Sequence, residues 1–97
     1  MTVESLTPIK DTDLLAEVKK GLNMQGNDYQ DDTVSVWIED VKQYILNAGA
    51  TADVVGSTLA VGVITKGVDD IYVSHKDTYS DMFYQGVERL RNVEVVG

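Results

Sequence analysis

The sequence contains no cysteine and only one histidine, His75. The absence of cysteine excludes disulfide bonds, thiolate metal ligands and cysteine nucleophiles. A histidine general base, a catalytic triad or a zinc site would have to use His75. That residue lies beside Lys76 and Asp77 in the polar segment 74–78. A solvent-exposed loop histidine is therefore the favoured interpretation, and we expect neither a catalytic residue nor a metal ligand there.

Long apolar runs and concentrated basic patches are also missing. No run of about 18 or more apolar residues is present to span a bilayer, and residues 1–5 lack the basic start and apolar run of a signal peptide. Acidic residues outnumber basic residues by 16 to 8, so the net charge is −8. Nucleic-acid affinity depends largely on lysine and arginine. We therefore expect no membrane association and no sequence-specific binding of nucleic acid.

Glycine is present, but not in the arrangement of a phosphate-binding loop. Gly56, Gly62 and Gly67 follow neither of the usual glycine-rich patterns, and Thr65-Lys66-Gly67 holds suitable residue types in the wrong order. We therefore expect no nucleotide cofactor. Glycines in this part of the chain would instead permit close approach of helices, although they lower helix propensity.

Acidic clusters are explained more simply by structure than by metal binding. Asp28, Asp31 and Asp32 lack the spacing of a calcium-binding EF-hand, and capping of the next helix accounts for at least one of them without a metal. Adjacent residues on a helix point about 100° apart. We therefore expect Asp69 and Asp70 to lie on a solvated face, without a shared ligand. The sequence thus contains no constellation for catalysis, and we expect a protein that is not an enzyme.

The apolar spacing predicts an all-α fold in one domain, residues 1–97, with a small bundle of about four helices. The only proline, Pro8, disfavours helix just before it, so residues 1–12 are expected to form a lead-in. Residues 93–97 are expected to form a tail, strand-like at 93–96, with no obvious pairing partner. The predicted helices are residues 13–22, a helix capped by one of residues 31–33 and ending at 48–49, residues 53–73, and residues 79–92 capped by Asp77 or Thr78.

The second of these helices has the clearest pattern, and the third has the weakest. Apolar residues of the second helix recur at i, i+3, i+4 and i+7 and include Trp37, its largest anchor. The first half of segment 53–73 is apolar nearly all round. Such a helix lies either at the centre of the core or against another chain. A strand over residues 59–64 is an open alternative, because short apolar runs do not distinguish the two structures.

These helices predict a monomer core and a set of residues that contact other chains. The predicted core contains Trp37, Ile38, Val41, Ile45, Phe83 and Leu90, and Met82 is placed on the same face of the last helix as Phe83. Val36 and Tyr84 lie on otherwise polar faces, and Leu59 and Val63 lie outside the main face of segment 53–73. We expect the protein-interface residues to be Val36, Leu59, Val63 and Tyr84.

The chain order and local sequence resemble the small head–tail connector, or adaptor, proteins of long-tailed phages. The matching stretches are Leu14–Leu22 (LLAEVKKGL), Asp31–Ile45 (DDTVSVWIEDVKQYI) and Tyr79–Leu90 (YSDMFYQGVERL). Together with segment 53–73, the resemblance covers residues 13–92. The family has no catalytic signature, so the match rests on helix order, length and pattern.

The resemblance implies a structural virion protein that forms a homo-oligomeric ring of about a dozen copies beneath the portal protein. The ring would link capsid to tail at the head–tail junction, extend the DNA channel and receive the next connector or tail-completion protein. Assembly would take place in the host cytoplasm. An acidic channel wall would repel phosphates and let DNA slide. The alternative is a stand-alone helical adaptor or regulatory module that binds one partner without forming a ring. A third possible function is that of a small hydrolase, which would require His75 or a metal site formed by Asp28, Asp31 and Asp32.

Overall fold

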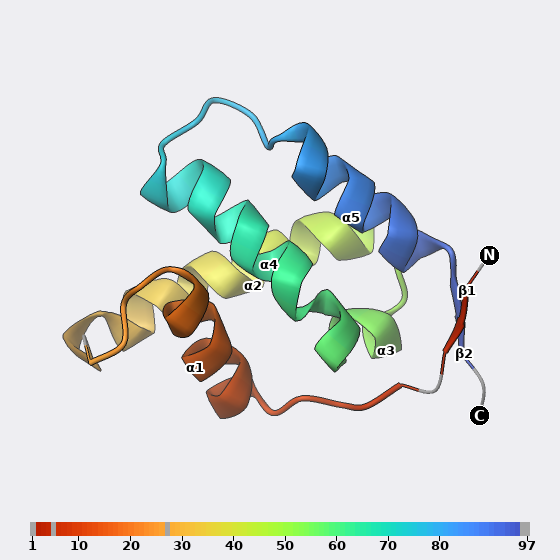
Figure 1. Ribbon diagram of the computed structural model, residues 1–97, viewed down its shortest axis with the longest axis horizontal. Helices are drawn as coiled ribbons and strands as arrows, with labels where there is room; N and C mark the ends of the chain where they lie inside the picture. The colour runs from red at the N-terminus through yellow and green to blue at the C-terminus, as the bar shows by residue number, and fades with distance from the viewer. Residues whose placement is uncertain (1, 5, 27, 96–97) are drawn as a thin grey trace.

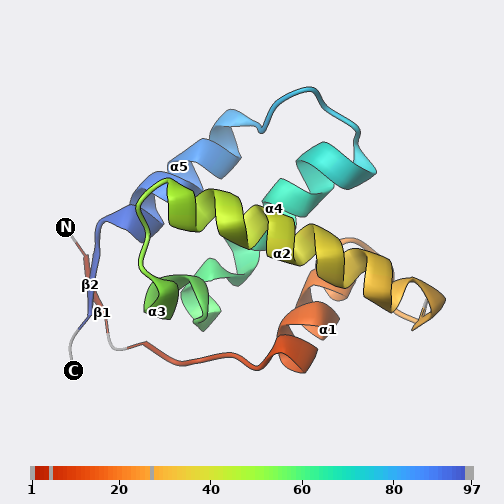
Figure 2. The same cartoon turned by 180° about the vertical axis from the view of Figure 1, so that it is seen from behind.

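The computed structural model describes residues 2–4, 6–26 and 28–95, and it shows a small all-α bundle with a short strand near each end of the chain (Figures 1 and 2). The predicted fold class is therefore confirmed. In the described residues the helices and strands are β1 (Thr2–Glu4), α1 (Asp11–Gly21), α2 (Asp31–Asn47), α3 (Ala52–Val55), α4 (Val61–Val68), α5 (Asp81–Arg91) and β2 (Val93–Val95). Short 3₁₀ turns cover Asp28–Gln30 and Thr58–Ala60, and a π-helical turn covers Asp69–Val73.

Helix α4 lies at the centre of the bundle. It packs against α1, α2 and α5, and Figure 1 shows α1 and α5 on either side of it with α2 crossing behind. Ile64 and Val68 on α4 are completely buried. A helix that is apolar nearly all round lies either at the centre of a core or against another chain. In this structure α4 lies at the centre of the core of a single chain.

The core of the bundle comes from the periodic faces that the sequence predicts. On α2 the buried residues are Val34, Ile38, Val41 and Ile45, and on α5 they are Phe83, Gly86, Val87 and Leu90. Trp37 differs from the prediction because it is only partly buried. Its ring stacks on Tyr72, with ring centroids 5.1 Å apart and an interplanar angle of 10°. Trp37 therefore covers the margin of the core.

The prediction of one continuous helix over residues 53–73 is wrong, because the chain breaks at Gly56–Ser57. The Ser57 hydroxyl donates to the carbonyl of Val54 over 2.7 Å and accepts from the backbone N–H of Leu59 over 3.3 Å. The lead-in crosses this point: the N–H of Ile9 donates to the carbonyl of Gly56 over 3.0 Å, and the N–H of Thr58 donates to the carbonyl of Thr7 over 2.9 Å. Backbone groups that a continuous helix would use internally are thus bonded to the lead-in.

Two helices begin at residues other than those predicted. Helix α1 begins at Asp11, two residues before the predicted start, and α5 begins at Asp81. The cap of α5 is Ser80, whose hydroxyl accepts a hydrogen bond from the N–H of Phe83 over 3.3 Å. Asp77 and Thr78 are exposed loop residues and do not cap it. Serine at this position satisfies a backbone donor that the helix itself leaves unpaired.

The ends of the chain meet as a parallel two-stranded pair, which Figure 1 shows beside the bundle. β1 and β2 pair with Thr2 opposite Val93, Val3 opposite Glu94 and Glu4 opposite Val95. The strand-like character of the C-terminal tail is confirmed over 93–95, and its partner is the start of the lead-in. Residues 96–97 of the predicted tail lie outside the described residues.

Candidate functional site

Asp70, at the π-helical turn after α4, is one of the buried polar or charged residues of the described chain. Asp70 is completely buried, so the prediction of a solvated face is wrong for this residue. Its carboxylate accepts from the N–H of Ser80 over 2.9 Å and lies 3.1 Å from the Lys66 amine and 3.3 Å from the Lys76 amine. Burial by itself raises the pKa of Asp70, but these hydrogen bonds outweigh burial and lower the pKa to about 2. The group therefore stays ionised and serves as an anchor for the loop 74–80.

Acidic residues at the turn before α2 belong to a second ionic cluster. The Lys19 amine lies 3.0 Å from Asp28 and 2.7 Å from Asp31, and the Lys19 side chain is buried. Hydrogen bonds from Lys19 to Asp31 and then Asp28 raise the pKa of Lys19. No side chain caps the start of α2, so the predicted capping role is wrong. These aspartates instead join the turn to α1.

The two remaining polar candidates, His75 and Asp32, are both exposed. His75 is exposed in the loop between α4 and α5, with φ of 54°. Asp32 is exposed on α2. Within residues 2–4, 6–26 and 28–95, no three histidine, cysteine or acidic side chains gather as metal ligands. No helix in the same residues is long and apolar enough to cross a bilayer.

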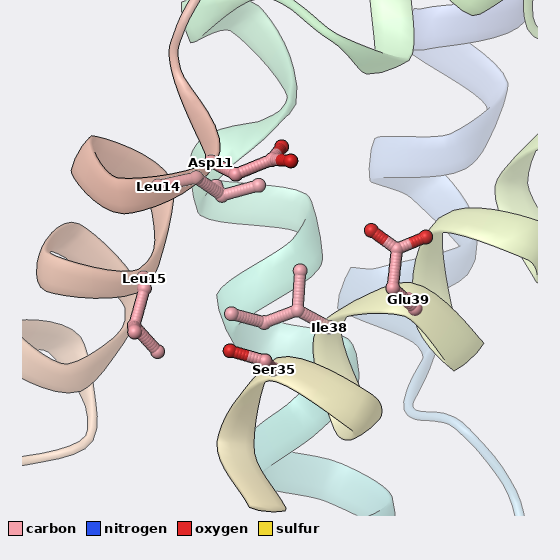
Figure 3. A pocket seen from close by; sticks show the side chains of 6 residues that line it. All are labelled: Asp11, Leu14, Leu15, Ser35, Ile38 and Glu39. Atoms are coloured by element: carbon pink, nitrogen blue, oxygen red, sulfur yellow. The ribbon is translucent and has the colours of Figure 1, made fainter. Parts of the chain in front are cut away.

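The surface hollows of the described residues include one between α1 and α2 and one between α4 and α5, and both are shallow. The α1–α2 hollow has a volume of about 150 Å³ and is lined by Asp11, Leu14, Leu15, Ser35, Ile38 and Glu39 (Figure 3). The α4–α5 hollow has a volume of about 270 Å³ and is lined by Leu59, Gly62, Val63, Lys66, Met82 and Arg89. Both are smaller than the roughly 300–1,000 Å³ of typical small-molecule pockets. Their size suits a protruding side chain of another macromolecule.

Three of the four predicted interface residues are exposed, and one of them, Leu59, lines the α4–α5 hollow. Val36, Tyr84 and Leu59 are 67%, 42% and 37% exposed. Val63 is largely buried, because its Cγ2 atom packs against Gly86 of α5. Val63 therefore contributes mainly to the monomer core and only lines the floor of the α4–α5 hollow.

The sequence pattern missed the exposure of Met82. Met82, which was predicted to share the face of Phe83, is 67% exposed. The buried face of α5 is centred on Gly86, Val87 and Leu90, and Met82 precedes Phe83 by one residue, about 100° around the helix. The angle of Met82 around the helix therefore places it at the margin of the buried face.

An aromatic cluster joins α2 to the start of α5. It consists of Tyr44, Tyr79 and Tyr84 around the buried Phe83, with the rings of Tyr79 and Phe83 stacked 4.1 Å apart and those of Tyr44 and Tyr79 4.8 Å apart. Burial raises the pKa of Tyr79, and burial followed by the nearby Tyr84 raises that of Tyr44. Aromatic residues that are half-exposed and held rigidly by neighbours are typical of protein contacts.

The described site features therefore include the ionic clusters around Asp70 and Lys19, the α1–α2 and α4–α5 hollows, and an exposed apolar and aromatic surface. Comparisons with models of known protein families, with curated proteins and with solved structures find no match to this chain.

Proposed function

We propose that this protein is a structural subunit of a phage head–tail connector, which assembles as a ring beneath the portal and links capsid to tail. The observation that carries the proposal is the placement of exposed apolar side chains on separate parts of the bundle. Val36 lies on α2, whereas Leu59 and Met82 flank the hollow between α4 and α5. Exposed apolar side chains of this size favour burial against another protein.

Separate contact surfaces favour a ring over a symmetric dimer. A two-fold dimer uses the same patch on both partners, whereas different patches that meet head to tail generate rings when the rotation closes. The α1–α2 and α4–α5 hollows are formed by different pairs of helices, and α4 lies between α1 and α5 (Figure 1). This arrangement supports head-to-tail association of copies.

The net charge of the chain also supports a role as part of the wall of a DNA channel. The net charge of −8 makes the surface repel DNA phosphates on average. A connector ring that surrounds DNA during packaging and ejection benefits from this repulsion, because strong phosphate contacts would retain the nucleic acid.

Light scattering on size-separated samples tests the proposal, with the purified chain measured alone and after mixing with a portal protein of a long-tailed phage. We expect a complex that contains one portal oligomer and a fixed, ring-like number of copies of this chain, visible as an annulus by electron microscopy. Absence of association under both conditions would contradict the proposal.

The aromatic cluster favours the alternative of a stand-alone helical adaptor. Tyr44, Tyr79 and Tyr84 form a compact patch of residue types that dominate many one-to-one protein interfaces. The stoichiometry of complexes purified with a partner separates the two functions. A constant one-to-one complex supports the adaptor, and a closed multi-copy assembly supports the connector.

A further inference from the structure

The two surface hollows differ in charge as well as in position. The mouth of the α1–α2 hollow carries the carboxylates of Asp11 and Glu39, whose side chains are 91% and 62% exposed. Figure 3 shows both carboxylates near one end of the hollow, with Leu15, Ser35 and Ile38 below them. Lys42 lies 4.0 Å from Asp11 and 3.5 Å from Glu39, so one ammonium faces two carboxylates. The mouth keeps a net negative charge.

The α4–α5 hollow has the opposite character. Its cationic residues are Lys66 and Arg89. The Lys66 amine is already engaged by Asp70 at 3.1 Å and Asp69 at 3.9 Å. Among the residues whose side chains the structure describes, no acidic residue forms an ion pair with Arg89, which is exposed. From this exposed position the Arg89 guanidinium can bind a carboxylate of another molecule, in the geometry that arginine favours.

Helix α5 presents this arginine together with an apolar side chain. Met82 and Arg89 are seven residues apart, two turns along one face of the helix, and both are exposed. The α1–α2 hollow offers the matching pair of features, an apolar floor from Leu14 and Ile38 beside the acidic mouth. Methionine adapts its shape to irregular apolar gaps.

We infer that the α1–α2 hollow of one copy receives the Met82–Arg89 face of α5 from a second copy. Met82 lies over the apolar floor, and Arg89 pairs with Glu39 or Asp11 at the acidic mouth. Because the α1–α2 hollow and the Met82–Arg89 face lie on different helices of the same copy, the contact repeats head to tail. This inference rests on the proposed ring and names the surfaces that build it.

Charge reversal on the full-length chain tests the pairing. Arg89→Glu alone and Glu39→Arg alone each place like charges in contact, and we expect each to weaken self-association about tenfold in sedimentation equilibrium. An equimolar mixture of the two variants restores opposite charges at every contact of an alternating assembly, and we expect it to regain wild-type association. Arg91→Glu and Glu17→Arg are matched controls with the same charge changes elsewhere on α5 and α1, and we expect neither control to weaken association.

Cysteine cross-linking detects the contact even when association is weak, because the natural chain has no cysteine to interfere. We expect Ser35→Cys and Met82→Cys, mixed under oxidising conditions, to form heterodimers at least about tenfold faster than Gln43→Cys mixed with Met82→Cys. Gln43 is exposed on α2 but does not line the hollow.

Equal cross-linking rates, or a mixture of charge variants that stays as dissociated as each alone, would overturn the inference. These outcomes differ from failure of the proposed function. A portal-bound ring that tolerates both charge reversals leaves the connector role intact and excludes this contact. Selective cross-linking without any ring on the portal supports the contact and excludes the connector role.

Discussion

The buried carboxylate of Asp70 accepts a hydrogen bond from the backbone N–H of Ser80 over 2.9 Å, across ten residues of chain. Ser80 in turn caps α5 through its hydroxyl. The carbonyl of Asp70 also accepts from the N–H of Lys76 over 2.8 Å. One residue thus joins the end of α4 to the loop and to the start of α5, which fixes the relative placement of the two helices that form the α4–α5 hollow.

Replacing Asp70 by asparagine is expected to lower the free energy of unfolding by about 2–4 kcal/mol, because it removes the buried charge that satisfies Ser80 and two lysines. Urea denaturation followed by circular dichroism measures the change. Asp69→Asn is the matched control: Asp69 is half-buried and its distance to Lys66 is 3.9 Å, so we expect a loss below about 1 kcal/mol. Equal losses in the two variants would contradict an anchoring role specific to Asp70.

Acid should destabilise the protein through the same residue. The pKa of Asp70 is about 2 in the folded chain, against an ordinary value of 3.8. The unfolded chain therefore binds more protons in this interval, so the stabilisation is fully present above about pH 4 and is lost as the pH falls towards 2. The expected contribution is about 2 kcal/mol. At pH 5 and below, the free energy of unfolding should fall less steeply with decreasing pH in Asp70→Asn than in the wild-type chain. An unchanged slope would assign the acid sensitivity to other groups.

Two glycines of α4 should respond in opposite directions to alanine. A Cβ at Gly67 would lie 2.6 Å from Cε1 of Phe83 and 2.7 Å from Cγ1 of Val41, both buried, so Gly67→Ala should destabilise the fold by about 1–3 kcal/mol. A Cβ at Gly62 would meet nothing within 4 Å, and Gly62→Ala should stabilise the helix by about 0.5–1 kcal/mol. Thermal unfolding of both variants is the measurement. Tolerance of alanine at Gly67 would mean that α4 and α5 are packed less closely than the structure shows.

Tyr72 should ionise later than an ordinary tyrosine. Its hydroxyl donates to the carboxylate of Asp40, and this hydrogen bond, followed by burial, raises the pKa of Tyr72 to about 12. The associated stability is present below about pH 10 and is lost as the pH rises through 12, because the folded pKa exceeds the unfolded one. Absorbance titration of tyrosinate, with Tyr72→Phe to identify the signal, should show this pKa fall towards 10 in Asp40→Asn. A Tyr72 pKa near 10 in the wild-type chain would exclude the hydrogen bond in solution.

The periodic pattern was sufficient for the helices whose faces are set locally. On α2, Val34, Ile38, Val41 and Ile45 are buried as the i, i+3, i+4 and i+7 spacing indicates. In the candidate site, the same helical spacing placed Val36 and Tyr84 on the polar faces of their helices, and both side chains are exposed. Val63 was assigned to an interface because local spacing does not reveal that Gly86, from another helix, makes room for its side chain.

The helical character of the chain and the buried face of α2 followed from the sequence by itself, because they depend on residues within one or two turns of each other. Only the tertiary structure decided that Asp70 is buried, that Gly56–Ser57 interrupts a helix and that the two ends of the chain pair. In each case the deciding hydrogen bonds come from distant residues, Ser80 for Asp70 and the lead-in at Thr7 and Ile9 for the break. The opposite charges of the two hollows also depend on packing, since each mouth is assembled from residues of different helices.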